Sequence, residues 1–274
     1  MSAERAVHRG SISNGMEFLA WGGGPRALLF LPGGPGSGLP VGLIGQMNRR
    51  WFQPFVNAGF TVWYVTRRRG MPRGHSVSDM ADDYAPMIAE QLGGRADLVV
   101  GESYGGMIAL YLAARHPDRV GHVAVVIAGA QVSAWGKDVD ARLVAALERG
   151  ERSAAGAAFA EYAIPGPRGR GIRRLLGPFI GLSLLSGKSY PASDVLVEVE
   201  AELAFDARPA LPDIAVPVIL LCGDEDRFFP PDVVEETARL IPGSTRVRYA
   251  GQGHFTVATG SDVPRDILRF VDRS

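Results

Sequence analysis

The sequence predicts an α/β protein with a doubly wound, mostly parallel sheet and one helical insertion. Two observations support this prediction. Short, wholly apolar segments alternate with stretches of helical spacing, and such segments suit strands that are buried on both faces of a parallel sheet. The alternation stops after residue 130 and resumes after residue 209. We therefore expect a core domain made of residues 1–130 and 210–274, with residues 131–209 inserted between its two halves.

Strands are expected at apolar segments that are bounded by glycine or proline. After an opening hairpin within residues 5–24, the expected strands cover residues 27–31, 60–65, 97–100, 123–127, 216–222 and 245–249. The helices that connect them are expected at residues 42–58, 79–93, 107–115, 231–240 and 262–272. Ser78 is the expected N-cap of the second of these helices. Because strands and helices alternate, we expect helices on both faces of the sheet.

The inserted segment contains no convincing buried strand and is expected to be helical. Prolines, which interrupt helices, divide it. The expected helices of the insertion cover residues 138–149, 152–163, 170–186 and 192–205.

Composition places the chain among ordinary globular proteins. Of its 274 residues, 46% are hydrophobic and 21% are charged, and a chain of this length buries a substantial core. The formal net charge is zero, so no excess of positive charge favours binding to nucleic acid or to an anionic membrane. The single cysteine, Cys222, excludes an intrachain disulfide.

The sequence carries no targeting or cofactor motif. Residues 1–10 lack the apolar stretch of a secretory signal, and no apolar run approaches the ~18 residues that span a bilayer. We therefore expect a cytoplasmic protein that contacts no membrane. No metal-ligand spacing and no dinucleotide-binding glycine motif occurs, so we expect no metal and no cofactor. The expected partner is a small-molecule substrate, and the sequence leaves both a monomer and a homodimer open.

A G-x-S-x-G motif covers residues 101–105, between the expected strand at 97–100 and the expected helix at 107–115. With 35 glycines in the chain, the motif alone has little weight. Its setting gives it weight, because a strand that turns sharply into a helix requires small residues on either side of the serine. Such a turn exposes the hydroxyl above the sheet. We therefore predict that Ser103 is a nucleophile.

A serine hydroxyl becomes nucleophilic when a base takes its proton, so one of the five histidines is expected beside it. His254 is the preferred base, because it stands in a glycine-rich loop at the carboxyl end of the last expected strand. His75, in a loop after an earlier strand, is the second candidate. The remaining histidines are placed at a helix end, in a strand and in the hairpin: His116, His122 and His8.

The histidine needs a carboxylate that holds its orientation. Three acids follow the next-to-last expected strand, within residues 223–226. A tight turn there aims the fourth residue back over the edge of the sheet, so Asp226 is preferred and Asp224 is the alternative. Asp138 and Asp140, which follow the preceding strand, are less favoured substitutes.

The chain order of Ser103, Asp226 and His254 matches that of the α/β-hydrolase family, which the sequence resembles over nearly its whole length. The segment GDEDRFFP (223–230) resembles the family's G-x-x-D-x-x-x-P acid segment, and GHF (253–255) resembles its late G-H-F segment. The resemblance implies an α/β-hydrolase fold in which these three residues are the catalytic triad. The helical insertion falls where the family places its cap, or lid.

The segment PGGPG (32–36) resembles the H-G-G-P-G loop of the proline iminopeptidase branch of this family, with Pro32 in place of the histidine. That histidine usually supports the loop. The resemblance implies an oxyanion hole formed by the backbone N–H groups of Gly34 and Tyr104, since Pro35 has no N–H to donate. Losing one such donor typically costs about 10²–10³ in rate, so the support of this loop matters.

Several side chains near these segments are candidates for binding substrate. The run from Arg67 to Arg69 follows a strand end and is a candidate for holding a substrate carboxylate, although such runs are more often solvated loops. Among the glutamates at 198, 200 and 202, which are candidates for a substrate amine, at most two share a helix face. The candidates for an apolar pocket, which core packing explains equally well, are Trp135, Phe228 and Phe255.

The activity that the resemblance implies is two-step acyl transfer by a serine hydrolase, with a small or medium apolar carboxylic ester, lactone or thioester as substrate. The alternative enzymes are a proline iminopeptidase-like aminopeptidase, a carbon–carbon bond hydrolase, and a biosynthetic acyltransferase or cyclase. A serine at the sharp turn argues against the epoxide hydrolases and dehalogenases of the same fold, which use aspartate there. A small-molecule receptor with the hydrolase fold is the alternative from another class.

Overall fold

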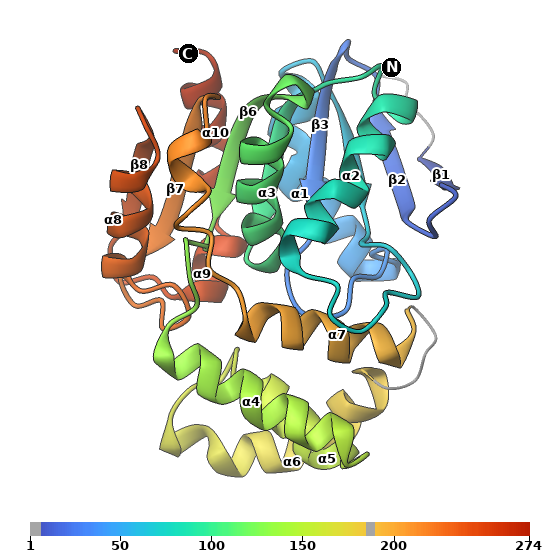
Figure 1. The fold of residues 1–274 in the computed structure, drawn as a ribbon, viewed down its shortest axis with the longest axis vertical. Helices are drawn as coiled ribbons and strands as arrows, with labels where there is room; N and C mark the ends of the chain where they lie inside the picture. The colour runs from blue at the N-terminus through green and yellow to red at the C-terminus, as the bar shows by residue number, and fades with distance from the viewer. Residues whose placement is uncertain (1–6, 185–189) are drawn as a thin grey trace.

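The computed structural model describes residues 7–184 and 190–274. Within them, eight strands form one sheet (Figure 1), which in spatial order consists of β1 (His8–Ser11), β2 (Glu17–Gly22), β4 (Phe60–Val65), β3 (Arg26–Leu31), β5 (Ala96–Glu102), β6 (Val120–Val126), β7 (Val218–Gly223) and β8 (Thr245–Tyr249). β1 pairs antiparallel with β2, and β2 pairs antiparallel with β4. The other six strands run parallel to one another. The predicted fold class, a mostly parallel sheet with an opening hairpin, is confirmed.

Helices cover both faces of this sheet, as the alternation predicts. Side chains of α1 (Gly42–Asn57), α9 (His254–Ala258) and α10 (Asp262–Val271) pack on one face. Side chains of α2 (Val77–Gln91), α3 (Tyr104–Arg115) and α8 (Pro231–Leu240) pack on the other face. Two short 3-10 turns, η1 (Pro117–Arg119) and η3 (Leu211–Asp213), precede β6 and β7.

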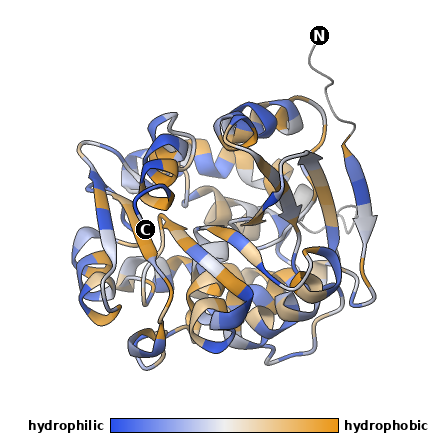
Figure 2. Cartoon of the chain, turned by 90° about the horizontal axis from the view of Figure 1, so that it is seen from above, coloured by the Kyte–Doolittle hydropathy of each residue, from blue (hydrophilic) through white to orange (hydrophobic). Residues whose placement is uncertain are grey.

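Each central strand divides its apolar side chains between two cores. In β5, Val99 packs in the core beneath α2 and α3, whereas Leu98 and Val100 pack in the core beneath α1 and α10. Neighbouring side chains of a strand point to opposite faces of a sheet, so two covered faces require apolar side chains at consecutive positions of the strand. Figure 2 shows hydrophobic residues along the central strands and on the helix faces that turn toward them.

Four helices between β6 and β7 form a separate group, which we term the helical layer: α4 (Ala134–Glu148), α5 (Arg152–Ala160), α6 (Arg170–Leu184) and α7 (Ala192–Leu203), with the 3-10 turn η2 (Pro167–Gly169). It lies beyond one end of the sheet (Figure 1). α5 and α6 approach closely because Gly156 has no side chain, and a Cβ there would overlap the carbonyl oxygen of Gly177. The predicted end of the third helix, residues 185–186, lies outside the described residues.

Three local features differ from the expectations. α2 begins at Val77 with Ser76, not Ser78, as its N-cap, because the Ser76 hydroxyl accepts the N–H of Asp79 and the Asp79 carboxylate accepts the N–H of Ser76. α3 begins at Tyr104, three residues earlier than expected. α9 was not predicted, because its five residues are too few to show the hydrophobic periodicity of a helix. Across residues 7–184 and 190–274, no helix combines the length and hydrophobicity that crossing a bilayer demands.

Candidate active site

Ser103 stands in the sharp turn between β5 and α3. Its backbone angles are φ 51° and ψ −114°, a combination that residues other than glycine rarely adopt. The turn depends on glycines at its sides. A Cβ at Gly106 would lie 2.6 Å from Cβ of Ala128, and one at Gly105 would overlap the carbonyl oxygen of Leu31. Gly105 and Gly106 therefore make room for a strained turn that presents the serine hydroxyl.

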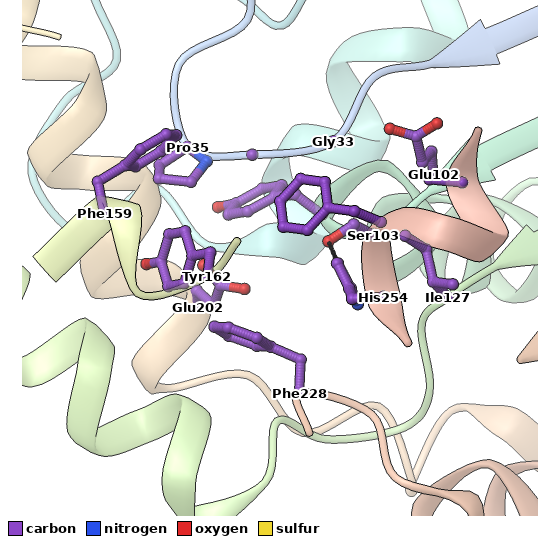
Figure 3. Close-up of a pocket in the computed structure, with 14 residues that line it drawn as sticks. Gly33, Pro35, Glu102, Ser103, Ile127, Phe159, Tyr162, Glu202, Phe228 and His254 are labelled. Atoms are coloured by element: carbon purple, nitrogen blue, oxygen red, sulfur yellow. Dashed lines mark hydrogen bonds between the residues drawn. The ribbon is translucent and has the colours of Figure 1, made fainter. Parts of the chain in front are cut away.

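The imidazole of His254 connects Ser103 to Asp226. Nδ1 lies 2.7 Å from Asp226 Oδ2. Nε2 lies 2.9 Å from Ser103 Oγ (Figure 3). A carboxylate only accepts hydrogen bonds, so Nδ1 carries the proton, and the neutral ring then accepts the hydroxyl of Ser103 at Nε2. The three residues that the sequence singled out thus form one continuous chain of hydrogen bonds.

Asp226 is held in place by the turn that follows β7. Its side chain is buried, and Oδ1 accepts the backbone N–H groups of Phe228 at 2.8 Å and Phe229 at 3.1 Å. Oδ2 is left to face His254. The backbone of the acid segment therefore fixes the orientation of the Asp226 carboxylate independently of its contact with His254.

The alternatives that the sequence left open are engaged elsewhere. Asp224, two residues before Asp226, accepts the N–H of Gly251 at 2.6 Å. His75 contacts Asp83, with Nε2 and Oδ2 at 2.8 Å. Asp138 and Asp140 both lie on α4 of the helical layer. Of the candidate acids and bases, Asp226 and His254 are the two whose side chains connect to the Ser103 hydroxyl.

A cavity of about 120 Å³ opens before the Ser103 hydroxyl (Figure 3). Of the aromatic candidates, Phe228 and Phe255 line it. Trp135 instead packs edge-on against Phe228, with ring centroids 5.2 Å apart. Phe159 and Tyr162, which sequence reasoning did not identify, line the cavity from α5 and the turn after it. No local pattern marks them, because their approach depends on how the helical layer sits over the sheet.

Gly34 and Tyr104 border the same cavity as Ser103. Tyr104 is the first residue of α3, so its N–H has no partner within the helix. Gly34 has φ 71°, and a Cβ there would meet nothing within 4 Å. The position therefore favours glycine for its backbone conformation alone. Both residues that the resemblance implies as backbone donors thus border the cavity in front of the Ser103 hydroxyl.

Glu102 directly precedes Ser103 and was not identified from the sequence. In Figure 3 it lies on the opposite side of the cavity from Tyr162. Burial raises the pKa of Glu102 to about 7, although the positive charge that His254 acquires on protonation opposes this shift. Its charge therefore changes near neutral pH. An acid at the end of a buried strand, directly before Ser103, is the sequence signal that points to such a group.

The glutamates of α7 separate by their spacing, as expected. Glu198 and Glu202 are buried on one face, whereas Glu200 turns outward and pairs with Arg73 at 2.7 Å. Glu202 lines the cavity that holds Ser103. Burial raises its pKa well above the ordinary range, and the charge of nearby Asp140 adds to the effect.

Asp140 forms a second buried acid next to Glu202. The Tyr162 hydroxyl donates to Oδ1 of Asp140 at 2.6 Å, while Oδ2 is buried with no hydrogen-bond partner among the described residues. Burial raises the pKa of Asp140 as well. Burial of two neighbouring carboxyl groups favours the protonated form of these acids, because each charge is removed from water and repels the other.

The arginine run does not behave as a solvated loop at its first residue. The side chain of Arg67 has no exposed surface and pairs with Glu198 at 2.8 Å. Arg68 and Arg69 reach nearer the surface and form ion pairs there. The expectation of a solvated run is therefore wrong for Arg67, which is enclosed between β4 and the helical layer.

Comparisons with known proteins agree with this architecture. A family model described as alpha/beta hydrolase fold matches residues 26–261. A pimeloyl-acyl-carrier-protein methyl ester esterase of Neisseria meningitidis is 31% identical over 220 residues, covering 73% of this chain and 79% of the relative. A putative carbamate hydrolase of Yersinia enterocolitica is 27% identical and covers 84% of each chain.

Among solved structures, an esterase from Exiguobacterium antarcticum superposes with a TM-score of 0.72. The match covers 97% of this chain and 100% of that one, at 19% identity. Similarity at this level of identity supports the fold.

Proposed function

Because this chain belongs to the alpha/beta hydrolase family, we propose that it is a serine hydrolase that cleaves a small or medium apolar carboxylic ester, lactone or thioester. The observation that carries this proposal is the chain of hydrogen bonds from Ser103 through His254 to Asp226. Hydrolysis is also what the related methyl ester esterase and the related putative carbamate hydrolase are named for. In this proposal the helical layer is the cap over the site.

The first step is acylation of Ser103. Its Oγ forms a bond to the substrate carbonyl carbon while the hydroxyl proton passes to Nε2 of His254. Asp226 stabilises the imidazolium that results and keeps the proton on Nδ1. When the tetrahedral intermediate collapses, the bond from carbon to the leaving group breaks, and Nε2 returns the proton to that group.

The second step repeats the first with water as the nucleophile. Water gives its proton to His254 and attacks the acyl carbon, and collapse returns the proton to Oγ of Ser103 and releases the acid. In both steps the N–H groups of Gly34 and Tyr104 are the proposed donors to the oxyanion. Such donors contribute most when they are fixed before the reaction begins.

The cavity supports a substrate of modest size. Its volume of about 120 Å³ is close to that of the roughly 150 Å³ apolar cavity that holds benzene in another protein. The enclosed part of the substrate is therefore on the order of six non-hydrogen atoms. Phe159, Phe228 and Phe255 give this space an apolar lining.

Glu202 favours a second candidate, an aminopeptidase-like activity. A carboxyl group in the cavity, with Asp140 behind it, offers an acceptor for the amino group of an aminoacyl substrate. An ammonium ion there would also offset the cost of burying two acids. Glu202→Gln is then expected to lower kcat/KM for aminoacyl esters and amides by about tenfold or more, the scale of a lost charged hydrogen bond.

A panel of esters, lactones, thioesters and aminoacyl amides tests the proposal and separates the two candidates. Turnover of neutral esters that survives Glu202→Gln supports the ester hydrolase. Glu200→Gln is the matched control, because it removes a carboxylate from the outward side of the same helix. A single burst of product without turnover contradicts a hydrolase and supports a receptor. Absence of both burst and turnover across the panel contradicts acyl transfer.

A further inference from the structure

The loop that carries Gly34 is held by one buried side chain. Arg67 Nη1 donates to the carbonyl oxygen of Pro32 at 2.8 Å, and Nη2 donates to the carbonyl oxygen of Gly34 at 2.9 Å. These two carbonyls belong to the peptide groups on either side of the peptide that bears the Gly34 N–H. Fixing both neighbours fixes the direction of that N–H. Pro32 has no side-chain donor or acceptor with which to hold the loop itself.

Glu198 holds the guanidinium from the helical layer. Its carboxylate accepts from Nε of Arg67 at 2.8 Å and from Nη2 at 3.1 Å, and it also accepts the backbone N–H of Gly36. The side chains of Arg67 and Glu198 are 0% and 1% exposed. The ion pair of Arg67 and Glu198 therefore holds this loop by hydrogen bonds to the backbone of Pro32, Gly34 and Gly36.

The same pair contacts the other proposed oxyanion donor. The guanidinium carbon of Arg67 lies 4.6 Å from the centroid of the Tyr104 ring. The Tyr104 hydroxyl donates to the backbone carbonyl of Glu198 at 2.9 Å. Gly34 lies in the loop after β3 and Tyr104 is the first residue of α3, and the pair of Arg67 and Glu198 contacts both.

We propose that Arg67, held by Glu198 of the helical layer, is the positioning residue that sets the oxyanion donors Gly34 and Tyr104 and couples the seating of the helical layer to catalysis. This inference rests on the proposed function, since it concerns the oxyanion of an acyl-transfer reaction. Neither Arg67 nor Glu198 lines the cavity at Ser103. Their effect is on the direction of two N–H groups.

Chemistry explains why an arginine serves here. Its planar guanidinium reaches two carbonyls and a carboxylate at once, in a fixed geometry that the single ammonium of lysine does not reproduce. A buried pair of this kind contributes little net stability, because desolvation offsets the attraction between the charges. Its value lies in the geometry that it imposes, and that geometry is centred on the proposed oxyanion loop.

The test compares Arg67→Lys and Glu198→Gln with Asp194→Asn. Asp194 is the matched control, because it is also buried on α7 and also holds a backbone loop, accepting the N–H groups of Gly70 and Met71 at 3.0 Å each. It does not hold the loop of Gly34. Kinetics with an activated acetate ester are measured at a temperature where circular dichroism shows each variant to be folded.

The second readout is inhibition by an alkyl boronic acid, which forms a tetrahedral adduct on the serine, compared with inhibition by the matching carboxylic acid product. For Arg67→Lys and Glu198→Gln we expect kcat to fall by about 10²-fold, the effect of misplacing a reacting geometry by about 1 Å, with little change in KM. Boronate affinity falls in parallel, whereas product affinity does not. Asp194→Asn keeps both values of the wild type.

Two results overturn the inference. One is boronate affinity that is unchanged in Arg67→Lys and in Glu198→Gln. The other is an equal loss of kcat and boronate affinity in Asp194→Asn, which would make the effect a general loosening of α7. Acyl-enzyme formation by the wild type is measured first. If the wild type forms none, the proposed function fails; if it does and the variants match it, only the positioning role fails.

Discussion

The carboxylate of Asp226 meets His254 with one oxygen while the backbone holds the other. Oδ2 lies 2.7 Å from Nδ1 of His254, and Oδ1 accepts the N–H groups of Phe228 and Phe229. Two backbone donors demand an acceptor at the Oδ1 position. These two backbone donors therefore also orient an asparagine placed at residue 226, whatever its contact with His254.

Asp226→Asn is expected to lower kcat by about 10⁴-fold with little change in fold. The backbone donors hold the amide oxygen, so the amide NH₂ points at Nδ1 of His254. The ring then carries its proton on Nε2 and cannot take the proton of Ser103. Asp224→Asn is the control, since Asp224 accepts a backbone N–H away from the histidine. Steady-state kinetics check both variants, and a larger loss in Asp224→Asn would identify Asp224 as the orienting acid.

Ser103→Ala is expected to abolish covalent labelling by a fluorophosphonate, because it removes the proposed nucleophile. Ser103→Gly is also expected to be more stable than Ser103→Ala by about 1 kcal/mol, since only glycine adopts φ 51° and ψ −114° without strain. Mass spectrometry of the labelled protein and chemical denaturation measure the two effects. Labelling that persists in Ser103→Ala contradicts the assignment of the nucleophile.

Glu102→Gln is expected to stabilise the protein more at about pH 8 than at about pH 5. The pKa of Glu102 rises from its ordinary 4.5 to about 7 on folding. Between these values the unfolded chain releases its proton while the folded chain keeps it, so the contribution of Glu102 to stability falls as pH rises and stays low above about 7. Glutamine has no such penalty. Melting temperatures of both proteins across this range provide the measurement, and an equal difference at both ends contradicts the raised pKa.

Gly105→Ala is expected to destabilise the fold by about 3 kcal/mol, because the new methyl group overlaps the carbonyl oxygen of Leu31 at the centre of the sheet. Gly171→Ala is the control. Gly171 is exposed in α6, and a Cβ there meets nothing within 4 Å, so a change of less than about 1 kcal/mol is expected. Urea unfolding of both variants measures the difference. Equal stabilities of the two variants would contradict the predicted clash between a Cβ at residue 105 and the carbonyl oxygen of Leu31.

The fold was predictable because its signals are local. A strand buried on both faces is apolar at consecutive positions, and residues 27–31 of β3, 98–100 of β5 and 218–222 of β7 carry that signature. α8 and β8 coincide with their predicted bounds, 231–240 and 245–249. Short elements were less predictable, since five residues of α9 contain no full hydrophobic period. The N-cap of α2 was misplaced by two residues, because two serines compete and only hydrogen-bond geometry separates them.

The candidate site was predictable in its parts and not in its surroundings. Ser103 and His254 are 151 positions apart. Each was predictable because it stands in a glycine-rich segment, and such glycines indicate a tight turn. No comparable local pattern marks Arg67. Its burial depends on Glu198, which lies 131 positions away on another part of the fold, and a sequence read in isolation favours the solvated interpretation of an arginine run.

By itself, the sequence determined the alternation of strands and helices, the strained turn at Ser103 and the order in which the acid and the histidine follow it. These follow from side-chain size, backbone sterics and periodicity, which act between near neighbours. The tertiary structure decided which acid faces His254, how large the cavity is, and that Arg67 and Glu198 enclose the loop of Gly34. The pairing of Asp226 with His254 depends on where the turn after β7 meets the loop after β8. The cavity and the contacts of Arg67 depend on how the helical layer packs over the sheet, and packing between distant segments has no local signature in the chain.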